Sequence, residues 1–496
     1  MPDPLARHVH AADSGWHNGD AVNFSRHERD GHWLTPFLAG VLATGAGWVV
    51  SHALSGRRRH VFDPRLIRNG SSAGEPLTPV VVVPGIMGSG LCRPDGTRVW
   101  LNLRNAIGHF NLSLPLSLPL SDGKDDLEPG NLLVGTDARM PRMFGFTEYY
   151  DLLEILEAAG FRLAVTANPD DPIYHVFTYD WRRDLVEAAR RLHEMLERLA
   201  DERSDPDARF NLVAHSMGGL VARYYLRYGT AEPSDDQPVT WAGARRIRNL
   251  VVVATPSGGA IHSLEALLYG SRVGISYTTL AAPVIARMPS VYQLLPVRGV
   301  PSLVDHNLAP LDSDILDVET WRRFGWGPFA PSTVRRLSGF TEEEAETYKP
   351  FLSAVLGRSA ALHRALDRVP ATPCPTRVLL VGGDCLPTLA RALVPEKEGL
   401  PPRFEPRNRK EADAMFEAGD GRVTRASLLG SHGPAAEGDP EQCGIPEASQ
   451  IVIGSADHHG IYREPTFQSI LLRALLRPEP HTLDGTDAED EDAAIA

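Results

Sequence analysis

Short runs of consecutive apolar, mostly β-branched residues recur along this chain. They alternate with longer stretches in which apolar residues repeat at helical spacing. The short runs have the pattern of strands that are buried on both faces of a sheet, and they span residues 80–83, 173–179, 210–214, 247–254, 378–381 and 451–453. The helical patterns span residues 149–159, 185–199 and 467–476. Because parallel strands need crossover connections, this alternation predicts the α/β class with a mostly parallel central sheet.

The alternation stops in two places. Between residues 257 and 370, helical patterns at 264–269 and 352–366 are joined by Pro-rich loops. We expect this region to be a helical cap inserted between two strands of the sheet. Residues 92–145 contain many Pro, Gly and Asp residues and show little periodicity, which predicts a long irregular excursion.

The 496 residues are expected to form three parts: a leader with an apolar segment and a linker (1–78), a main domain (79–478) and an acidic tail (479–496). The tail region holds six acidic residues between positions 484 and 492 and no Lys or Arg there, which is typical of a disordered, solubilising end. The net charge of −13 argues against a general nucleic-acid-binding protein.

The leader has no ordinary secretory signal peptide, because acidic residues from Asp3 to Asp30 precede any apolar run. Residues 33–54 are apolar and are followed by three arginines at 57–59. Pro36 and several glycines interrupt this segment, and its length barely suffices to cross a membrane. We expect a helix that packs on the main domain or lies on a membrane surface, with a marginal membrane span as the alternative. If the segment does span, the three arginines would hold the catalytic part on the cytoplasmic side. The expected location is cytoplasmic, with peripheral membrane contact through this segment.

Four cysteines occur in the chain, at Cys92, Cys374, Cys385 and Cys443. Four in this length do not make a disulfide framework, and no C-x-x-C pair is present. Reduced thiols in a cytosolic enzyme are the expectation. A bridge between Cys374 and Cys385 is the alternative for an exported protein.

The sequence V-A-H-S-M-G-G-L-V-A-R places Ser216 between the strand pattern 210–214 and a helical pattern. A serine on a sharp strand-to-helix turn is the nucleophile elbow of an α/β-hydrolase. The turn needs small residues two positions away on each side. Gly218 meets that need, and Ala214 stands where a glycine is usual.

A serine nucleophile needs a histidine base and a carboxylate that orients the base, and this fold has them in the order Ser, Asp or Glu, His. The late sequence A-D-H-H-G follows the strand pattern 451–453, which makes His458 the preferred base and His459 the alternative. Two aspartates remain open for the third role. Asp384 follows the strand pattern 378–381, and Asp420 lies in the glycine turn G-D-G-R-V. Asp457 is a weaker candidate because it adjoins the histidines.

Two backbone N–H groups are expected to stabilise the oxyanion of an acyl-transfer intermediate. One belongs to Met217, directly after the nucleophile, and the other to Ile86 in P-G-I-M-G-S, directly after the strand pattern 80–83. The same loop matches neither the P-loop pattern nor the glycine pattern of dinucleotide-binding proteins. No H-E-x-x-H motif or second ligand cluster accompanies the late histidines, so no metal and no cofactor are expected.

With these residues in place, the chain resembles the lecithin:cholesterol acyltransferase family. The resemblance rests on motifs that occur in the family's order: V-V-V-P-G-I-M-G-S (81–89), Y-D-W-R (179–182), A-H-S-M-G-G (214–219), A-T-P-S-G-G (254–259), M-P-S-V-Y-Q-L-L-P (288–296), G-D-G-R-V (419–423) and the late D-H. It implies a serine-dependent acyl transfer on a lipid ester, Asp420 as the orienting carboxylate, and a lipid-facing cap after Gly259. For the Y-D-W-R motif we expect a framework contact between Asp180 and Arg182.

The chain departs from the family's pattern at Arg422, where Thr is usual, and at Ser257, where an aromatic residue is common. The site residues and the resemblance together predict a lipid O-acyltransferase or a phospholipase or lipase that works through an acyl-enzyme on Ser216. Two alternatives are a plain carboxylesterase that uses only water and a lipid-binding protein without turnover.

Overall fold

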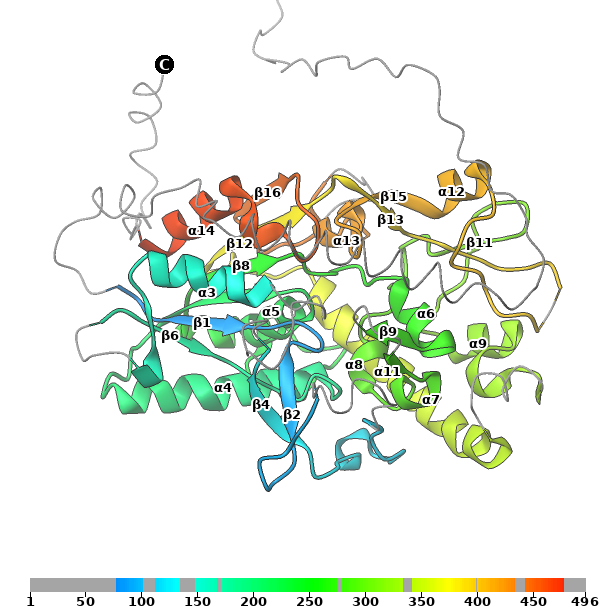
Figure 1. Ribbon diagram of the computed structural model, residues 1–496, viewed down its shortest axis with the longest axis horizontal. Coiled ribbons are helices and arrows are strands. Elements are labelled where there is room, and N and C mark those ends of the chain that lie inside the picture. Colours follow the sequence, from blue (N-terminus) through cyan, green and yellow to red (C-terminus); the bar gives the residue numbers. More distant parts are fainter. Residues whose placement is uncertain are drawn as a thin grey trace, which may run out of the picture. The chain divides into compact units, whose positions relative to one another are not determined.

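The computed structural model describes residues 77–100, 112–133, 148–166, 171–273, 278–332, 341–397, 399–432 and 442–476. At the centre lies a seven-stranded sheet in the order β16-β12-β8-β7-β1-β6-β5 (Figure 1). The strands are β1 (Val80–Val83), β5 (Arg162–Leu163), β6 (Ile173–Val176), β7 (Phe210–His215), β8 (Ile247–Val253), β12 (Arg377–Gly383) and β16 (Gln450–Gly454). Every neighbouring pair in this sheet runs parallel, which confirms the predicted parallel α/β sheet.

Strand β1 shows why the apolar runs are continuous rather than alternating. All four of its valines are completely buried. Val81 and Val83 belong to the core on one face of the sheet, and Val80 and Val82 belong to the core on the other. A parallel sheet covered by helices on both faces needs apolar side chains at every position of a central strand.

Two pairs of helices supply that cover. α4 (Leu185–Glu202) and α5 (Met217–Tyr228) pack on one face, whereas α3 (Glu148–Ala158) and α14 (Pro465–Leu476) pack on the other. In Figure 1, α3 and α14 lie above β1 and β6, and α4 lies below them. These helices confirm the helical patterns expected from the spacing of apolar residues, with ends that differ by a few positions.

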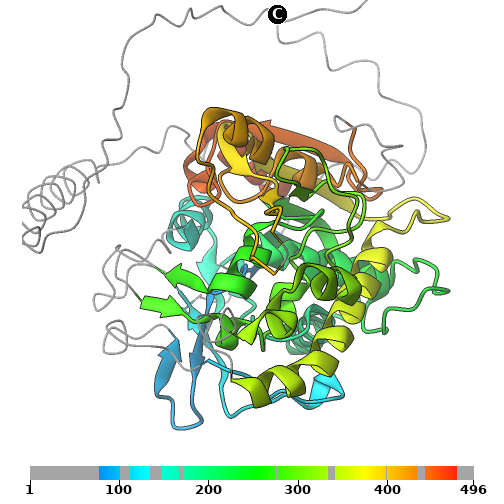
Figure 2. The same cartoon turned by 90° about the vertical axis from the view of Figure 1, so that its right-hand side faces the viewer.

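The cap predicted between residues 257 and 370 is present between β8 and β12. Its longest helix, α11, begins with a capping box in which the Thr341 hydroxyl and the Glu344 side chain each bind the other's backbone N–H. α11 contacts α8 and α9 within the insertion and also reaches α5 of the main domain, and Figure 2 shows the green to yellow helices gathered together. The elements of the insertion are α6 (His262–Tyr269), β9 (Ser271–Val273), β10 (Thr278–Leu280), α7 (Ala282–Ile285), α8 (Pro289–Tyr292), β11 (Leu303–Val304), α9 (Val318–Phe324), η6 (Gly327–Phe329) and α11 (Glu342–Asp367).

The expectation of an irregular excursion over residues 92–145 was wrong in part. Two strands of a three-stranded antiparallel sheet lie within it; the sheet has the order β3-β2-β4, with β2 (Ser89–Cys92), β3 (Arg98–Trp100) and β4 (Glu128–Leu132). The strands are short and carry Gly and Pro, and the register shifts between neighbours, so no alternating pattern marks them in the sequence. 

The remaining elements are small. They are η2 (Leu120–Asp122), η4 (Ala164–Thr166), η5 (Ala242–Arg245), β13 (Leu386–Leu389), β14 (Ala392–Leu393), α12 (Arg409–Met415), β15 (Phe416–Gly419), α13 (Arg425–Leu429) and η8 (Ile461–Arg463). The antiparallel pair β13 and β15 matters for the site, because β15 ends directly before Asp420.

The apolar leader segment 33–54 and the acidic tail lie outside the described residues, so their predicted roles stay predictions. Within the described ranges, no helix combines the length and the hydropathy that a membrane crossing requires. Cys92, Cys374, Cys385 and Cys443 are free, so the alternative bridge between Cys374 and Cys385 is not formed.

Candidate active site

Ser216 occupies the turn between β7 and α5, where it is the N-cap of the helix with φ 53° and ψ −126°. A positive φ is strained for a residue with a side chain and persists only where the surroundings fix it. Two hydrogen bonds do so: the Ser216 N–H donates to the Val253 carbonyl at 2.7 Å, and the Thr255 hydroxyl donates to the Ser216 carbonyl at 2.9 Å. The serine side chain is therefore held at the end of the sheet.

The small residues around Ser216 are required by close backbone approach. A Cβ atom on Gly218 would lie 2.5 Å from the Pro84 carbonyl oxygen and 2.6 Å from that of Val83. A Cβ atom on Gly85 would lie 2.9 Å from the Ser216 Cβ. The loop after β1 thus packs directly against the serine turn, as the elbow motif predicts.

His458 follows β16 and lies beside Ser216, although 242 positions separate them in the chain. Its Nε2 atom is 3.2 Å from the Ser216 Oγ, and its Nδ1 atom is 2.8 Å from the Asp420 Oδ2. The His458 and Asp420 side chains are 8% and 2% exposed, so solvent scarcely weakens the contact between them. The structure brings together the three residues that the sequence analysis preferred.

Asp420 is held in place by its own glycine turn. Its Oδ1 accepts hydrogen bonds from the N–H groups of Arg422 at 2.9 Å and Val423 at 2.7 Å, which leaves Oδ2 for His458. Burial alone would raise the pKa of this carboxyl, but His458 and the two N–H donors outweigh burial and hold the pKa below its ordinary value. Because Arg422 contributes its backbone, the departure from Thr at this position does not disturb the turn.

The residues left open as alternatives lie elsewhere. Asp384 is one third exposed and its carboxylate faces Arg425 at 3.6 Å. His459 is exposed, and Asp457 accepts bonds from the N–H groups of His459 and Gly460 rather than from an imidazole ring. The contact to His458 therefore distinguishes Asp420 from Asp384 in a way that the residues alone did not.

Ile86 and Met217, the predicted oxyanion donors, stand at the loop after β1 and at the first position of α5. Neither backbone N–H donates a hydrogen bond to another group within the described residues. Ile86 directly follows Gly85, which packs against Ser216. Two N–H groups beside a serine hydroxyl that have no partner among the described residues are the arrangement that an oxyanion needs.

Sequence reasoning did not single out two residues that surround this set. His215 precedes Ser216 and is 2% exposed, and Tyr149 on α3 is 1% exposed. Their side chains approach to 3.1 Å between the Tyr149 hydroxyl and the His215 Nδ1. The histidine was visible in the motif itself, whereas nothing in the sequence separates Tyr149 from the other apolar-face residues of its helix.

The Y-D-W-R motif forms the expected framework contact. Arg182 is fully buried and makes paired hydrogen bonds to Asp180 and also to Asp125, which the sequence did not indicate. The other departure from the family pattern is also accommodated: the Ser257 hydroxyl accepts a hydrogen bond from Arg223 at 3.2 Å.

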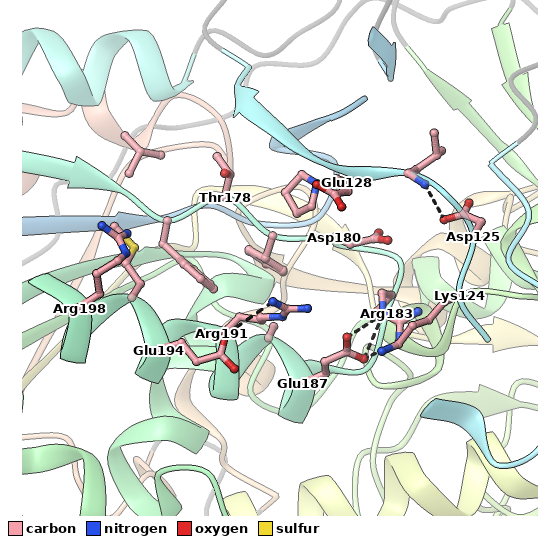
Figure 3. A pocket seen from close by; sticks show the side chains of 17 residues that line it. Lys124, Asp125, Glu128, Thr178, Asp180, Arg183, Glu187, Arg191, Glu194 and Arg198 are labelled. Atoms are coloured by element: carbon pink, nitrogen blue, oxygen red, sulfur yellow. Dashed lines mark hydrogen bonds and ion pairs between the residues drawn. The ribbon is translucent and has the colours of Figure 1, made fainter. Parts of the chain in front are cut away.

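A groove of about 700 Å³ lies away from the site, between β6, residues 124–129 and α4 (Figure 3). Ser216, Asp420 and His458 do not line it. Two pairs of its charged side chains contact each other, Arg183 with Glu187 at 2.7 Å and Arg191 with Glu194 at 3.6 Å. Within the described residues, no group of three His, Cys, Asp or Glu side chains is arranged to hold a metal ion.

The parallel sheet order, a serine at positive φ after the central strand and the Ser216–His458–Asp420 contacts define an α/β-hydrolase fold with a helical cap. The model of the lecithin:cholesterol acyltransferase family matches residues 145–329, which confirms the resemblance over that stretch. The matched stretch includes Ser216 and ends before Asp420 and His458.

Two curated relatives match parts of the chain. Phosphatidylcholine-sterol acyltransferase of Gallus gallus is 26% identical over 222 residues, which are 40% of this chain and 50% of that protein. An uncharacterised protein of Saccharomyces cerevisiae is 25% identical over 252 residues, 50% of this chain and 34% of that protein. The chain therefore spans about a third to a half of the length of these relatives.

Among solved structures, the Tle4–Tli4 complex is similar with a TM-score of 0.46 and 15% identity, covering 80% of this chain and 98% of that chain. Bacillus licheniformis lipase BlEst2 in its mature form has a TM-score of 0.32 and 11% identity, covering 82% of this chain and 97% of that one. Similarities of this size carry no argument about activity, so the fold class rests on the sheet order and the serine turn.

Proposed function

We propose that this chain is a serine-dependent enzyme that transfers acyl groups from lipid esters, as a lipid O-acyltransferase or as a phospholipase or lipase. The observation that carries the proposal is the contact of one imidazole with both the Ser216 hydroxyl and the Asp420 carboxylate. A histidine held in this way can take a proton from serine on one side while the carboxylate stabilises the resulting imidazolium on the other. The family resemblance supports a lipid ester as the acyl donor.

In the proposed first step, the Ser216 Oγ forms a bond to the ester carbonyl carbon and its proton passes to the His458 Nε2. The carbonyl oxygen becomes the oxyanion, which accepts hydrogen bonds from the N–H groups of Ile86 and Met217. The intermediate then collapses, the bond to the alcohol oxygen breaks, and His458 returns its proton to the leaving alcohol. What remains is an acyl ester on Ser216.

In the second step, an incoming hydroxyl gives its proton to His458 and attacks the acyl carbon, and the bond to Ser216 breaks as the proton returns to the serine oxygen. With water as the acceptor the product is a fatty acid, and with an alcohol it is a new ester. Asp420 stays ionised throughout, since its hydrogen bonds favour the charged form.

A fluorophosphonate probe tests the proposal. The probe should form a covalent adduct with the wild-type chain, and Ser216→Ala should lose the labelling while unfolding at the same temperature. Unchanged labelling of Ser216→Ala would refute the assignment. Absence of turnover on phospholipids and on short p-nitrophenyl esters, together with retained lipid binding, would favour the non-catalytic lipid-binding protein.

Product analysis separates transferase from hydrolase. The pure protein is incubated with a phospholipid that carries a labelled acyl chain, with and without an added long-chain alcohol. A labelled ester that appears only with the alcohol would assign transfer, whereas labelled fatty acid in both incubations without any labelled ester would assign hydrolysis alone. The remaining phospholipid is measured in the same incubations. Ser216→Ala, treated in parallel, serves as the blank.

Peripheral membrane contact through residues 33–54 and a cytoplasmic location are further proposals. Their support is the apolar segment and the basic residues that follow it. Vesicle co-sedimentation of the full chain is compared with that of a chain lacking residues 1–60, with probe labelling as the check on folding. Equal sedimentation of both chains would remove the segment from any role in membrane contact.

A further inference from the structure

Three buried hydrogen bonds in series join the loop after β1 to the backbone of His458. The Gly85 N–H donates to the Tyr149 hydroxyl at 2.7 Å. The Tyr149 hydroxyl lies 3.1 Å from the His215 Nδ1, and the His215 Nε2 lies 3.2 Å from the His458 carbonyl oxygen. The series connects segments that are far apart in the sequence and that meet only at the site.

The direction of each bond follows from the chemistry of the end groups. A carbonyl oxygen only accepts, so the His215 Nε2 carries the proton that binds it. Burial, together with the neighbouring charges of His458 and His459, holds the pKa of His215 well below its ordinary value. In the neutral ring, Nδ1 is therefore the acceptor, and the Tyr149 hydroxyl donates a hydrogen bond to it. The tyrosine oxygen in turn accepts from Gly85.

Ring packing also holds the two side chains in place. The Tyr149 ring meets the His215 ring edge-on with centroids 5.7 Å apart, and the His215 ring lies 5.0 Å from that of His458. A Cβ atom on Gly88 would lie 2.9 Å from the Tyr149 ring. The glycine leaves room for the tyrosine to reach Gly85, so the loop and the ring are fitted to each other.

The series ends at the loop that carries Ile86 and at His458. The proposed reaction needs a fixed distance between these two parts of the site. Gly85 precedes Ile86, whose N–H faces the oxyanion in the proposed reaction, and His458 is the proposed base. We propose that Tyr149 and His215 are positioning residues that hold the oxyanion loop and the base in register with Ser216. This inference rests on the proposed function, and neither side chain touches the reacting atoms.

The test removes one link at a time in the full chain. Tyr149→Phe deletes the hydroxyl in the middle of the series. His215→Gln keeps an amide N–H near the Nε2 position and loses the acceptor for Tyr149, whereas His215→Asn keeps an amide oxygen near the Nδ1 position and loses the donor to His458. Tyr228→Phe is the matched control, because its hydroxyl is also buried and donates to the Ala365 carbonyl at 2.8 Å, away from the site.

Each variant is labelled with the fluorophosphonate probe, and both the final extent of labelling and the rate constant are measured. The extent counts folded sites, whereas the rate constant reports how well each folded site is aligned. We expect complete labelling of Tyr149→Phe with a rate constant lowered about ten- to a hundredfold, the size of effect that misplacement by about 1 Å produces. The control should match wild type in both measurements. With a p-nitrophenyl ester, kcat should fall and KM should stay unchanged.

Rate constants equal to the control in Tyr149→Phe and in both His215 variants would overturn the inference. A reduced extent of labelling with an unchanged rate constant in all three would do the same, because it would assign a role in folding alone. If Tyr149→Phe fails to fold, the two His215 variants decide by the same criterion. A wild-type chain that the probe does not label would refute the proposed function itself, a different outcome from either of these.

Discussion

Helix α5 carries a buried polar cluster near each end, and both clusters join the helix to segments that flank the same strand, β16. At the N-terminal end, Ser216 meets His458, which follows β16. Toward the C-terminal end, Arg223 and Arg227 both bind Glu447, which precedes β16, at 2.7 Å each. We call these the serine cluster (Ser216, Asp420 and His458) and the arginine cluster (Arg223, Arg227 and Glu447).

The two clusters differ in what is left for chemistry. In the arginine cluster all three side chains are at most 2% exposed, and further bonds run to Ser257 and to the Leu366 and Arg368 carbonyls. Within the described residues, the Arg227 Nε is the one guanidinium nitrogen of this cluster without a hydrogen-bond partner. In the serine cluster, Ser216 is only half-buried and its backbone is strained. Buried charges that pair with one another hold segments of the fold in position, whereas an accessible hydroxyl beside a base can react. We therefore expect the arginine cluster to control stability and the serine cluster to control activity.

The largest effect should come from the carboxylate of the serine cluster. Asp420→Asn keeps the shape of the side chain but removes the charge that stabilises the His458 imidazolium, and it favours the wrong histidine tautomer. We expect kcat to fall by about 10⁴, measured with a p-nitrophenyl ester.

Asp384→Asn is the matched control, because Asp384 also follows a strand of this region and contacts Arg425 rather than His458. It should keep the wild-type kcat. A loss in Asp384→Asn as large as that in Asp420→Asn would break the comparison, since it would remove the distinction that the hydrogen bonds draw between the two aspartates.

The next effect concerns stability. Glu447→Ala leaves two buried guanidinium groups without their shared carboxylate, and removing one partner of a buried ion pair costs about 3–5 kcal/mol. Urea unfolding should report this loss in the free energy of unfolding. The rate constant for probe labelling, normalised to the extent of labelling, should stay at the wild-type value. A folded Glu447→Ala protein that labels slowly would show that the arginine cluster also aligns the serine.

A smaller effect is expected in the pH dependence of stability. Burial raises the pKa of the Glu447 carboxyl, but Arg223 and Arg227 outweigh burial and hold the folded pKa below the ordinary value of 4.5. The unfolded chain therefore binds this proton first as the pH falls. The stabilisation is fully present above pH 4.5 and is lost as the pH drops toward the folded pKa.

Urea unfolding of the wild type and of Glu447→Gln, repeated between neutral and acidic pH, checks the sign. The difference in free energy of unfolding between them should narrow below the ordinary pKa. A difference that grows in acid would contradict the assigned direction of the pKa shift.

Much of this arrangement could be predicted from local pattern. The β-branched run Val80–Val83 identifies a strand because a doubly covered strand must be apolar throughout. Ser216 is recognisable because the steric demands of its turn fall on residues two positions away. Asp420 and Asp384 could not be separated in this way, since both follow strands and only the three-dimensional meeting with His458 differs.

The arginine cluster and the Tyr149–His215 series lay beyond such reasoning. Glu447 lies in no helix or strand, 220 positions from the nearer of its two arginines, and a carboxylate in a loop is usually exposed. Tyr149 has the spacing of an ordinary apolar helix residue, and its hydroxyl gains a role only because α3 packs over the loop after β1. Long-range pairing of polar groups leaves no periodic signal in a sequence.

The smallest effect should come from the small residues two positions before and after Ser216. Ala214 is fully buried in β7 and stands where glycine is usual. Ala214→Gly should lose about 0.5–1 kcal/mol of stability, the cost of glycine within a strand, and should label at the wild-type rate. Gly218→Ala is the opposing variant, because its Cβ would meet the Pro84 carbonyl at 2.5 Å and displace the loop that carries Ile86. Labelling at the wild-type rate in both variants would mean that this close approach does not align the site. A slow Ala214→Gly beside a fast Gly218→Ala would place the steric demand on the strand side of the serine instead of the helix side.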